Sequence, residues 1–244
     1  MTQDDPIALD DLKRSTNVKT DINRSHPIQP DQEWANAWSH GLAALLWVGV
    51  GWFLISSSLA SNHFERSTGL AAAVSVYVAS VLLTFTCSTL SHVFLEPPWL
   101  DRFRSADQAS IYLMIVGTYT PIVLAFAPAT ILWPLMVGMW IGALIGFFAK
   151  LILNHRIDSI STVSYLLLGW LPAIPMFRNV PISLGLAMLL GGVTYSVGVG
   201  FLIHDHRRRY LHVVWHALVV IASLIHAFGI WAYIIRDWGI DRVE

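Results

Sequence analysis

Residues 213–235 read VVWHALVVIASLIHAFGIWAYII and contain no Lys, Arg, Asp or Glu. An α-helix rises about 1.5 Å per residue, so about 20 apolar residues cross the hydrocarbon core of a bilayer. This stretch therefore predicts a transmembrane helix. The side chains in it that can ionise near neutral pH are two histidines, His216 and His226. Ionisable groups inside such helices are costly and indicate function.

The rest of the sequence has a similar composition. Of its 244 residues, 55% are hydrophobic and 13% are charged, and the mean hydropathy is +0.57. The charged share is about half that of a typical soluble domain. Polar or proline-containing joints separate seven apolar stretches, and the sequence thus predicts an all-α membrane protein, a bundle of seven transmembrane helices. The stretches are Ala37–Ser58, Gly69–Ser91, Ala109–Phe126, Ile131–Leu153, Ile160–Phe177, Ile182–Ile203 and Val213–Ile235.

Lys and Arg are distributed unevenly between the two sides that this order of helices defines. One side takes the N-terminal segment and loops two, four and six, with 11 of the 15 basic residues. The other side takes Arg66, Arg178, Arg236 and Arg242. Cytoplasmic loops carry the excess of basic residues in membrane proteins. The sequence therefore predicts a cytoplasmic N-terminus, a C-terminus outside, and a multi-pass protein of the cell (inner) membrane.

The N-terminal segment differs from the remainder of the chain. Residues 1–32 are polar and charged, and they lack the apolar core of a signal peptide. They are interpreted as a disordered cytoplasmic tail, and residues 33–244 as the seven-helix transmembrane domain. The formal net charge of −1 gives no indication of a nucleic acid partner. With Cys87 as the single cysteine, an intrachain disulfide and a thiolate metal cluster are excluded.

Four ionisable side chains on three predicted helices are expected at one depth, near the cytoplasmic side. His92 follows the second apolar stretch, Asp107 precedes the third, and His212 and His216 lie at the start of the seventh. His212 and His216 are four residues apart, so both imidazoles lie on one helical face. The predicted topology therefore allows all four side chains to meet.

Three neutral imidazoles with an open fourth position are the ligand set of a catalytic zinc site. His92, His212 and His216 are thus the candidate Zn²⁺ ligands. Asp107 is the candidate catalytic residue that would hold a water at the metal or take its proton. Ser88, one turn before His92, could hydrogen-bond a substrate carbonyl or position Asp107. An isolated HxxxH pair is a weak signal; the third histidine and the aspartate at matching depth favour the metal site.

Two further histidines lie in apolar helices. His40 begins the first helix on the same side, where it is either a group that supports the site or simply an interfacial histidine. His226 lies ten residues after His216, roughly 15 Å deeper at about 1.5 Å per residue. It is too far away to join the metal site and is expected to hydrogen-bond within the bundle.

The sequence resembles the hemolysin III family, bacterial members of the progestin and adipoQ receptor superfamily, which includes the adiponectin receptors. The resemblance covers almost the whole chain after about residue 30. It is carried by ANAWSHG at residues 35–41, STLSH at 88–92, DQASIYLMIVGTYTP at 107–121 and HVVWHALV at 212–219. One departure is Gln108, where bacterial relatives often carry His.

The resemblance implies seven helices with the N-terminus inside and a zinc ion held by His92, His212 and His216. It implies that Asp107 lies near the zinc-bound water with Ser88 beside it. His40 and His226 match recurrent family positions that are not ligands. The family is similar in architecture to alkaline ceramidases, which hydrolyse a lipid amide with a comparable zinc site.

Several functions are compatible with these features. The leading hypothesis is a zinc-dependent intramembrane hydrolase of a lipid amide or ester, with a membrane lipid that enters from the cytoplasmic leaflet as substrate or ligand. The alternative is a non-enzymatic receptor or membrane-homeostasis sensor with structural zinc. A pore-forming hemolysin is less favoured because the helices lack a polar stripe, and a transporter because paired interrupted helices are not seen. The sequence leaves open the substrate, turnover, the oligomeric state, and whether Asp107 binds zinc directly or through water.

Overall fold

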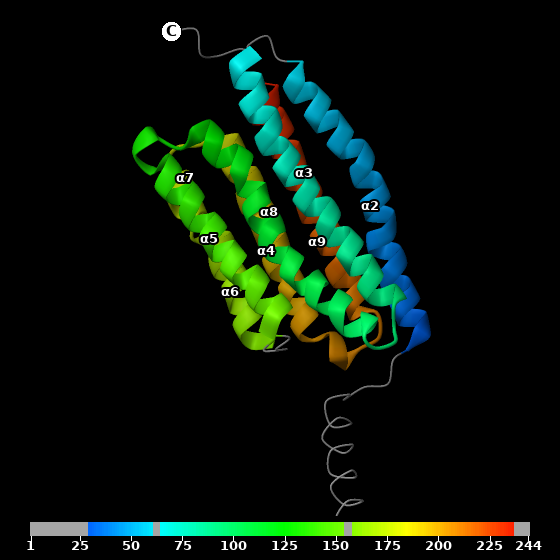
Figure 1. The fold of residues 1–244 in the computed structure, drawn as a ribbon. Coiled ribbons are helices and arrows are strands. Elements are labelled where there is room, and N and C mark those ends of the chain that lie inside the picture. The colour runs from blue at the N-terminus through cyan, green and yellow to red at the C-terminus, as the bar shows by residue number, and fades with distance from the viewer. Residues whose placement is uncertain (1–28, 61–63, 154–157, 237–244) are drawn as a thin grey trace, which may run out of the picture. The chain divides into compact units, whose positions relative to one another are not determined.

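The computed structural model describes residues 29–60, 64–153 and 158–236, and within these ranges it contains helices and no strand (Figure 1). The predicted tail, residues 1–32, lies outside the described residues except for its last four. The compact unit that carries the fold begins at Gln32. The elements are α2 (Pro30–Leu59), α3 (Phe64–Val93), α4 (Trp99–Phe126), α5 (Ala129–Leu153), α6 (Asp158–Trp170), α7 (Ala173–Met176), α8 (Ile182–Ile203), the 3₁₀ turn η1 (Asp205–Arg207), α9 (Leu211–Ile230) and the π-helical turn η2 (Trp231–Ile235).

Six helical segments of the described chain are long and apolar enough to cross a membrane. They are Pro30–Leu59, Thr68–Val93, Trp99–Phe126, Ala129–Ile152, Ile182–Ile203 and Leu211–Ile235. Together with a largely apolar exposed surface, for example Trp52 at 77% and Ile182 at 84% exposure, they make the chain a multi-pass membrane protein.

The predicted fifth stretch, Ile160–Phe177, is divided in the structure. Helix α6 ends at Trp170, and the four-residue helix α7 begins at Ala173. Pro172 lies between them; it has no N–H to donate, and it disfavours helical backbone at the residue before it. The apolar helical segment here, Thr162–Met176, is therefore shorter than the six spans.

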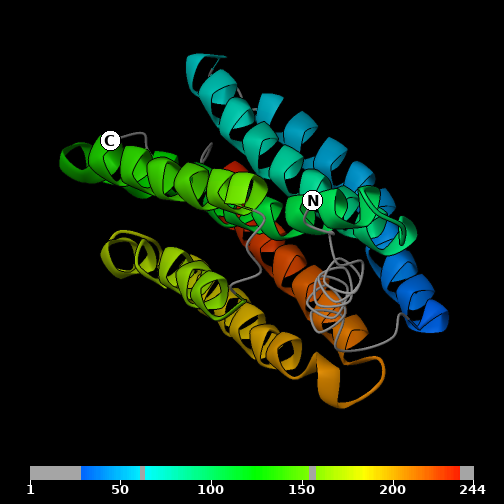
Figure 2. The ribbon, with the colours of Figure 1, turned by 60° about the horizontal axis from the view of Figure 1, so that its bottom comes forward.

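Helix α4 is central in the bundle, since it packs against α3, α5, α6 and α9. Its contact with α3 is close: a Cβ added at Gly117 would lie 2.2 Å from Ser80 Oγ and 2.9 Å from Ser80 Cβ. Only glycine permits this approach. Helix α8 packs along α9, and α2 runs beside α3 at one edge (Figures 1 and 2).

The buried core joins α2, α3 and α9. The ring of Trp47 on α2 meets that of Tyr77 on α3 edge to face, with centroids 5.4 Å apart. Both side chains are fully buried, and Tyr77 donates its hydroxyl hydrogen to the carbonyl of Ser223 on α9 at 2.8 Å. Because water is absent from the hydrocarbon, a hydrogen bond of this kind fixes how α3 and α9 pack.

The polar ends of four helices lie together in this bundle. The N-terminal turns of α2, α4 and α9 and the C-terminal turn of α3 meet at one end of the bundle, the lower end in Figure 1. This end contains all the candidate site residues that the sequence places near the cytoplasmic side.

Candidate metal centre

Three imidazoles meet where α3 ends and α9 begins. His92 lies in the last turn of α3, and His212 and His216 lie in the first two turns of α9. Each ring offers one nitrogen, and these three atoms lie within 4.8 Å of one another. The ring centroids are 4.6 Å apart for His212 and His216, as the four-residue spacing predicts, and 5.1 and 5.2 Å from His92 to each of them. The predicted cluster is therefore present and could hold a metal ion.

The Nδ1 atom of each imidazole has a partner outside the cluster. His92 Nδ1 lies 2.6 Å from Glu33 Oε2, and His212 Nδ1 lies 3.0 Å from Asp205 Oδ2. His216 Nδ1 lies 2.7 Å from Ser39 Oγ. Metal-binding histidines usually donate their second ring N–H to a carboxylate, carbonyl or similar acceptor, which fixes the orientation of the ring.

These partners determine where the ring hydrogens lie. Ionised carboxylates only accept, so His92 and His212 donate from Nδ1. Ser39 already donates its hydroxyl hydrogen to the carbonyl of Asn36 at 2.7 Å, so it accepts from His216 Nδ1. In the neutral form of each ring, which metal ligation requires, Nε2 then carries the lone pair. His92 Nε2 is buried and has no hydrogen-bond partner among the described residues.

Lone pairs that converge in a buried place require a positive charge or a hydrogen donor between them. Three neutral imidazoles suit Zn²⁺, which forms bonds of about 2.0–2.1 Å to histidine nitrogen, but they also suit other first-row ions. The residues therefore fit a metal ion, and the donor set leaves a further coordination position open.

Asp107 on α4 lies next to this cluster but outside the three-donor set. It is close enough to His92 and His212 for electrostatic interaction with both. Ser91 Oγ lies 3.2 Å from Asp107 Oδ2 and shares its hydrogen with the carbonyl of Ser88, 2.8 Å away. Ser88 Oγ is buried and close enough to Asp107 to interact with its carboxylate, although it forms no hydrogen bond within 3.5 Å in the described part of the chain.

His40 lies against the cluster from α2. Its side chain is 3% exposed and stacks on the His216 ring, with centroids 3.7 Å apart and an angle of 14° between the planes. Neither of its ring nitrogens has a hydrogen-bond partner among the described residues. His40 is therefore part of the site's wall and is not a solvated interfacial histidine.

Sequence reasoning missed the partners of the imidazoles. Glu33 lies in the first turn of α2, before the predicted apolar stretch, and Ser39 lies near the start of that stretch. Asp205 lies in η1 among basic residues. Glu33 also accepts from Arg104 Nη2 on α4 at 3.4 Å, so it connects three helices. In the sequence, Glu33, Asn36 and Ser39 are spaced three residues apart, which places them along one side of a helix and indicates a polar stripe.

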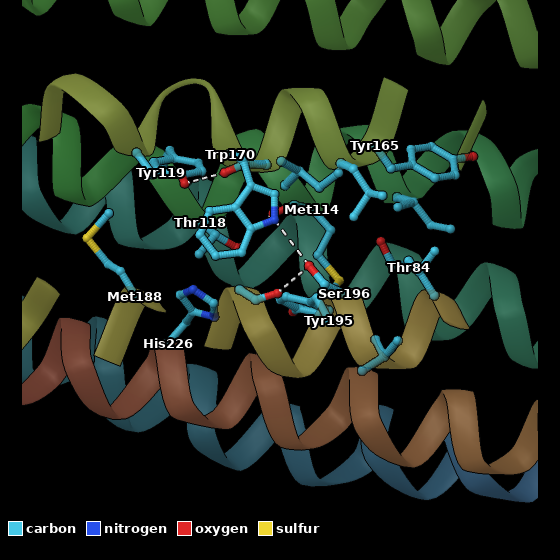
Figure 3. Close-up of a pocket in the computed structure, with 18 of the residues that line it drawn as sticks. Thr84, Met114, Thr118, Tyr119, Tyr165, Trp170, Met188, Tyr195, Ser196 and His226 are labelled. Carbon is cyan, nitrogen blue, oxygen red and sulfur yellow. Dashed lines mark hydrogen bonds between the residues drawn. The ribbon is translucent and has the colours of Figure 1, made fainter. Parts of the chain in front are cut away.

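An apolar cavity begins beside the cluster and runs between α4, α6, α8 and α9. Its volume is about 110 Å³. Its lining includes His40 and Asp107, which lie at the cluster, and also Tyr119, Trp170 and His226, which Figure 3 shows close together. The remaining lining is mostly apolar, as is usual for small-molecule pockets.

Comparison with known proteins identifies related chains. The sequence model of a family described as Haemolysin-III related matches residues 28–227, which include the three histidines and Asp107. The chain is 33% identical to Hemolysin-3 of Bacillus cereus over 208 residues, which cover 84% of this chain and 92% of that protein. It is 32% identical to the Hemolysin-3 homolog of Bacillus subtilis over 209 residues, 84% of this chain and 95% of the relative. The human Monocyte to macrophage differentiation factor is 26% identical over 213 residues, 83% of this chain and 84% of that protein.

Proposed function

This chain belongs to the haemolysin III family, and from that premise we propose that it is an intramembrane zinc-dependent hydrolase of a lipid amide or ester. The observation that carries the proposal is the histidine cluster. One nitrogen from each ring lies within 4.8 Å of the other two, Glu33, Asp205 and Ser39 each contact the Nδ1 atom of one ring, and Asp107 lies beside the cluster. Structural zinc sites usually have four protein ligands, whereas three are typical of catalytic sites.

A zinc ion bound by three histidines, with its fourth position open, would supply Lewis acidity and make water a nucleophile near neutral pH. His92, His212 and His216 would hold it, while the Nδ1 partners keep each ring in the tautomer that ligation needs.

The protein's own groups would perform the proton transfers. An Asp107 carboxylate oxygen would accept a proton as water adds to the substrate carbonyl carbon. It would then deliver that proton to the leaving nitrogen or oxygen when the C–N or C–O bond breaks, so that an acid and an amine or alcohol are formed. Ser91 steadies Asp107 Oδ2. The buried hydroxyl of Ser88, which lies beside Asp107, would donate to the carbonyl oxygen.

The apolar cavity would take the lipid's chain. It begins at Asp107 and His40 and continues into the bundle, so a chain in it would present its carbonyl end to the cluster. The cluster lies at the end of the bundle where Arg102, Arg104 and Arg207–Arg209 gather, so we place it at the cytoplasmic leaflet of the cell (inner) membrane.

The metal is tested by zinc stoichiometry in the purified full-length protein. We expect about one zinc per chain in the wild type and loss of zinc when His212→Ala and His216→Ala are combined. His206 is an exposed histidine in η1, just before α9, and His206→Ala is the control that should keep its zinc. A wild-type protein that takes up no zinc after reconstitution near neutral pH would remove the hydrolase proposal.

Turnover is tested with fluorescent ceramide and fluorescent acyl esters in vesicles. Asp107→Asn should retain zinc but lose at least about a hundredfold in rate, since general acid–base catalysis contributes about 10²–10⁴-fold. Asp101→Asn, an exposed aspartate on the same helix, should behave as wild type. Full turnover in Asp107→Asn would show that this carboxylate does not transfer the proton.

A receptor or sensor with structural metal is the second candidate. It is favoured by the way that the cluster connects helices, because Glu33 joins α2 to His92 on α3 and to Arg104 on α4. In that case, zinc removal would lower thermal stability and no tested amide or ester would be cleaved.

A further inference from the structure

The far end of the cavity contains a second group of polar side chains, deep in the bundle. His226 lies ten residues after His216 on α9, so it is roughly 15 Å farther along the helix axis, at about 1.5 Å per residue. Tyr119, Trp170, Tyr195 and Ser196 surround the same end (Figure 3).

Most of these polar groups hydrogen-bond within the protein. Tyr119 donates its hydroxyl hydrogen to the carbonyl of Gly169 at 2.5 Å. Trp170 Nε1 donates to Ser196 Oγ at 3.1 Å, and Ser196 donates to the carbonyl of Gly192 at 2.8 Å. The hydroxyl of Thr118, also on the cavity wall, donates to the carbonyl of Met114 at 2.8 Å.

Two groups at this end differ from the others. The hydroxyl of Tyr195 is buried and has no hydrogen-bond partner in the described chain. His226 Nδ1 lies 2.9 Å from the carbonyl of Ala222, which can only accept, so Nδ1 carries the hydrogen and Nε2 carries a lone pair. The structure gives His226 Nε2 no hydrogen bond within the described residues. His226 lines the cavity, so its Nε2 is an unused acceptor at the cavity wall, whereas the Tyr195 oxygen is buried within the protein.

The position of His226 is built into the packing of α8 and α9. A Cβ added at Gly191 would lie 2.2 Å from His226 Cε1 and 2.5 Å from Nδ1, so only glycine lets the imidazole lie against α8. The ring also stacks on Tyr195, with centroids 5.7 Å apart and planes inclined at 23°. The imidazole is thus fixed at the cavity wall and cannot turn away without a change in α8.

At this depth bulk water does not satisfy polar groups, so an unused acceptor is costly. A hydroxyl group complements it, because its hydrogen would go to His226 Nε2. We propose that this end of the cavity binds a hydroxyl group carried on the apolar chain of the ligand, at a distance of roughly 15 Å from the group held at the metal centre. The ligand class is then a hydroxylated lipid chain. The inference rests on the proposed function, which identifies the group held at the metal centre as the carbonyl end of a lipid.

The experiment uses the full-length protein in detergent and a fluorescent fatty acid as displaceable probe. Competitors are octadecanoate and octadecanoates hydroxylated at successive positions from mid-chain to the methyl end. One range of positions should bind at least about tenfold more tightly than octadecanoate, because a buried acceptor that is otherwise unsatisfied then gains its partner.

Variants locate the preference. His226→Leu removes the acceptor and should reduce the preference to about twofold or less while octadecanoate binds as before. Thr118→Val is the matched control, since it removes a hydroxyl on the same wall that already has a partner, and it should keep the preference. Should His226→Leu not fold, Gly191→Ala displaces the ring without removing it and should also abolish the preference.

The outcomes separate this inference from the proposed function. Equal binding of octadecanoate and all hydroxylated isomers would overturn the inference, since a trapped water would then satisfy His226 Nε2, but zinc binding and turnover would be untouched. A preference that persists in His226→Leu would overturn it too. If no fatty acid displaces the probe, the cavity does not take lipid chains, and the lipid part of the proposed function also fails.

Discussion

At the scale of single residues, the three imidazoles of the cluster differ in what holds them. His92 and His212 donate to carboxylates, whereas His216 donates to a hydroxyl. A carboxylate partner raises the basicity of the ring and so strengthens its bond to a metal. Because Glu33 is also close to Arg104, part of its charge is already balanced. The metal centre therefore depends on residues that do not touch the metal.

Glu33→Gln should weaken zinc binding about tenfold to a hundredfold, the usual cost of losing such a partner. The variant keeps the shape of the side chain but removes the charge opposite His92 Nδ1. Competition with a chromophoric chelator measures the affinity. Glu96→Gln, in the exposed loop between α3 and α4, is the control and should bind zinc as wild type does. Unchanged affinity in Glu33→Gln would mean that His92 is not a metal ligand, or that its partner has no influence on it.

The ligands could be predicted from the sequence, but their partners could not. His212 and His216 share a helical face by their spacing, and the order of the helices brings His92 to the same end. By contrast, the contact of Glu33 with His92 joins α2 to α3. The contact of Asp205 with His212 joins η1 to α9 across a turn in which Tyr210 has a positive φ of 64°. Such contacts depend on tertiary packing, which a hydropathy pattern does not contain.

At the scale of helices, close packing of α3 on α4 positions Ser91 beside Asp107. Gly117 makes this approach possible, because a Cβ at this position would clash with Ser80 on α3. The hydroxyl of Thr84 on α3 also donates to the carbonyl of Ser110 on α4 at 3.1 Å. Because Ser80 Cβ is fixed to its own helix, it cannot move away from a side chain at position 117.

Gly117→Ala should therefore destabilise the protein by about 1–3 kcal/mol, the usual cost of overpacking, and lower its melting temperature in detergent. Gly138→Ala on α5 is the matched control, because a Cβ there meets nothing within 4 Å. That variant should melt at or slightly above the wild-type temperature, since alanine is the better helix former. Equal melting temperatures for the two variants would contradict the close α3–α4 contact.

Helix positions could be predicted from apolar length, but helix ends and breaks could not. Six of the seven stretches lie in helices that meet the criteria for a membrane span. The fifth is interrupted at Leu171 and Pro172, because proline chemistry acts on the backbone whatever the local hydropathy. Helix α2 begins at Pro30, seven residues before the predicted Ala37, and those added turns carry Glu33 and Asn36.

At the scale of the whole molecule, the divided segment decides the topology. If α6 and α7 together cross the membrane as a broken helix, there are seven crossings and the termini lie on opposite sides. With six crossings the termini would share a side. The basic loops favour seven, because Arg207–Arg209 then lie on the same side as Arg102, Arg104 and Lys150. Broken helices are tolerated where the protein surrounds their irregular backbone, and here Ala173 and Met176 are buried.

Reporter fusions at the two ends of the full-length chain test this topology. A fluorescent protein that matures only in the cytoplasm should fluoresce at the N-terminus and stay dark after Glu244, while alkaline phosphatase, active only outside, should give the reverse. The same pair of reporters inserted after Arg208 should report the cytoplasm, which locates the metal centre at that leaflet, since His212 follows directly in α9. A fluorescent C-terminal fusion would establish an even number of crossings and leave α6 and α7 as a re-entrant segment.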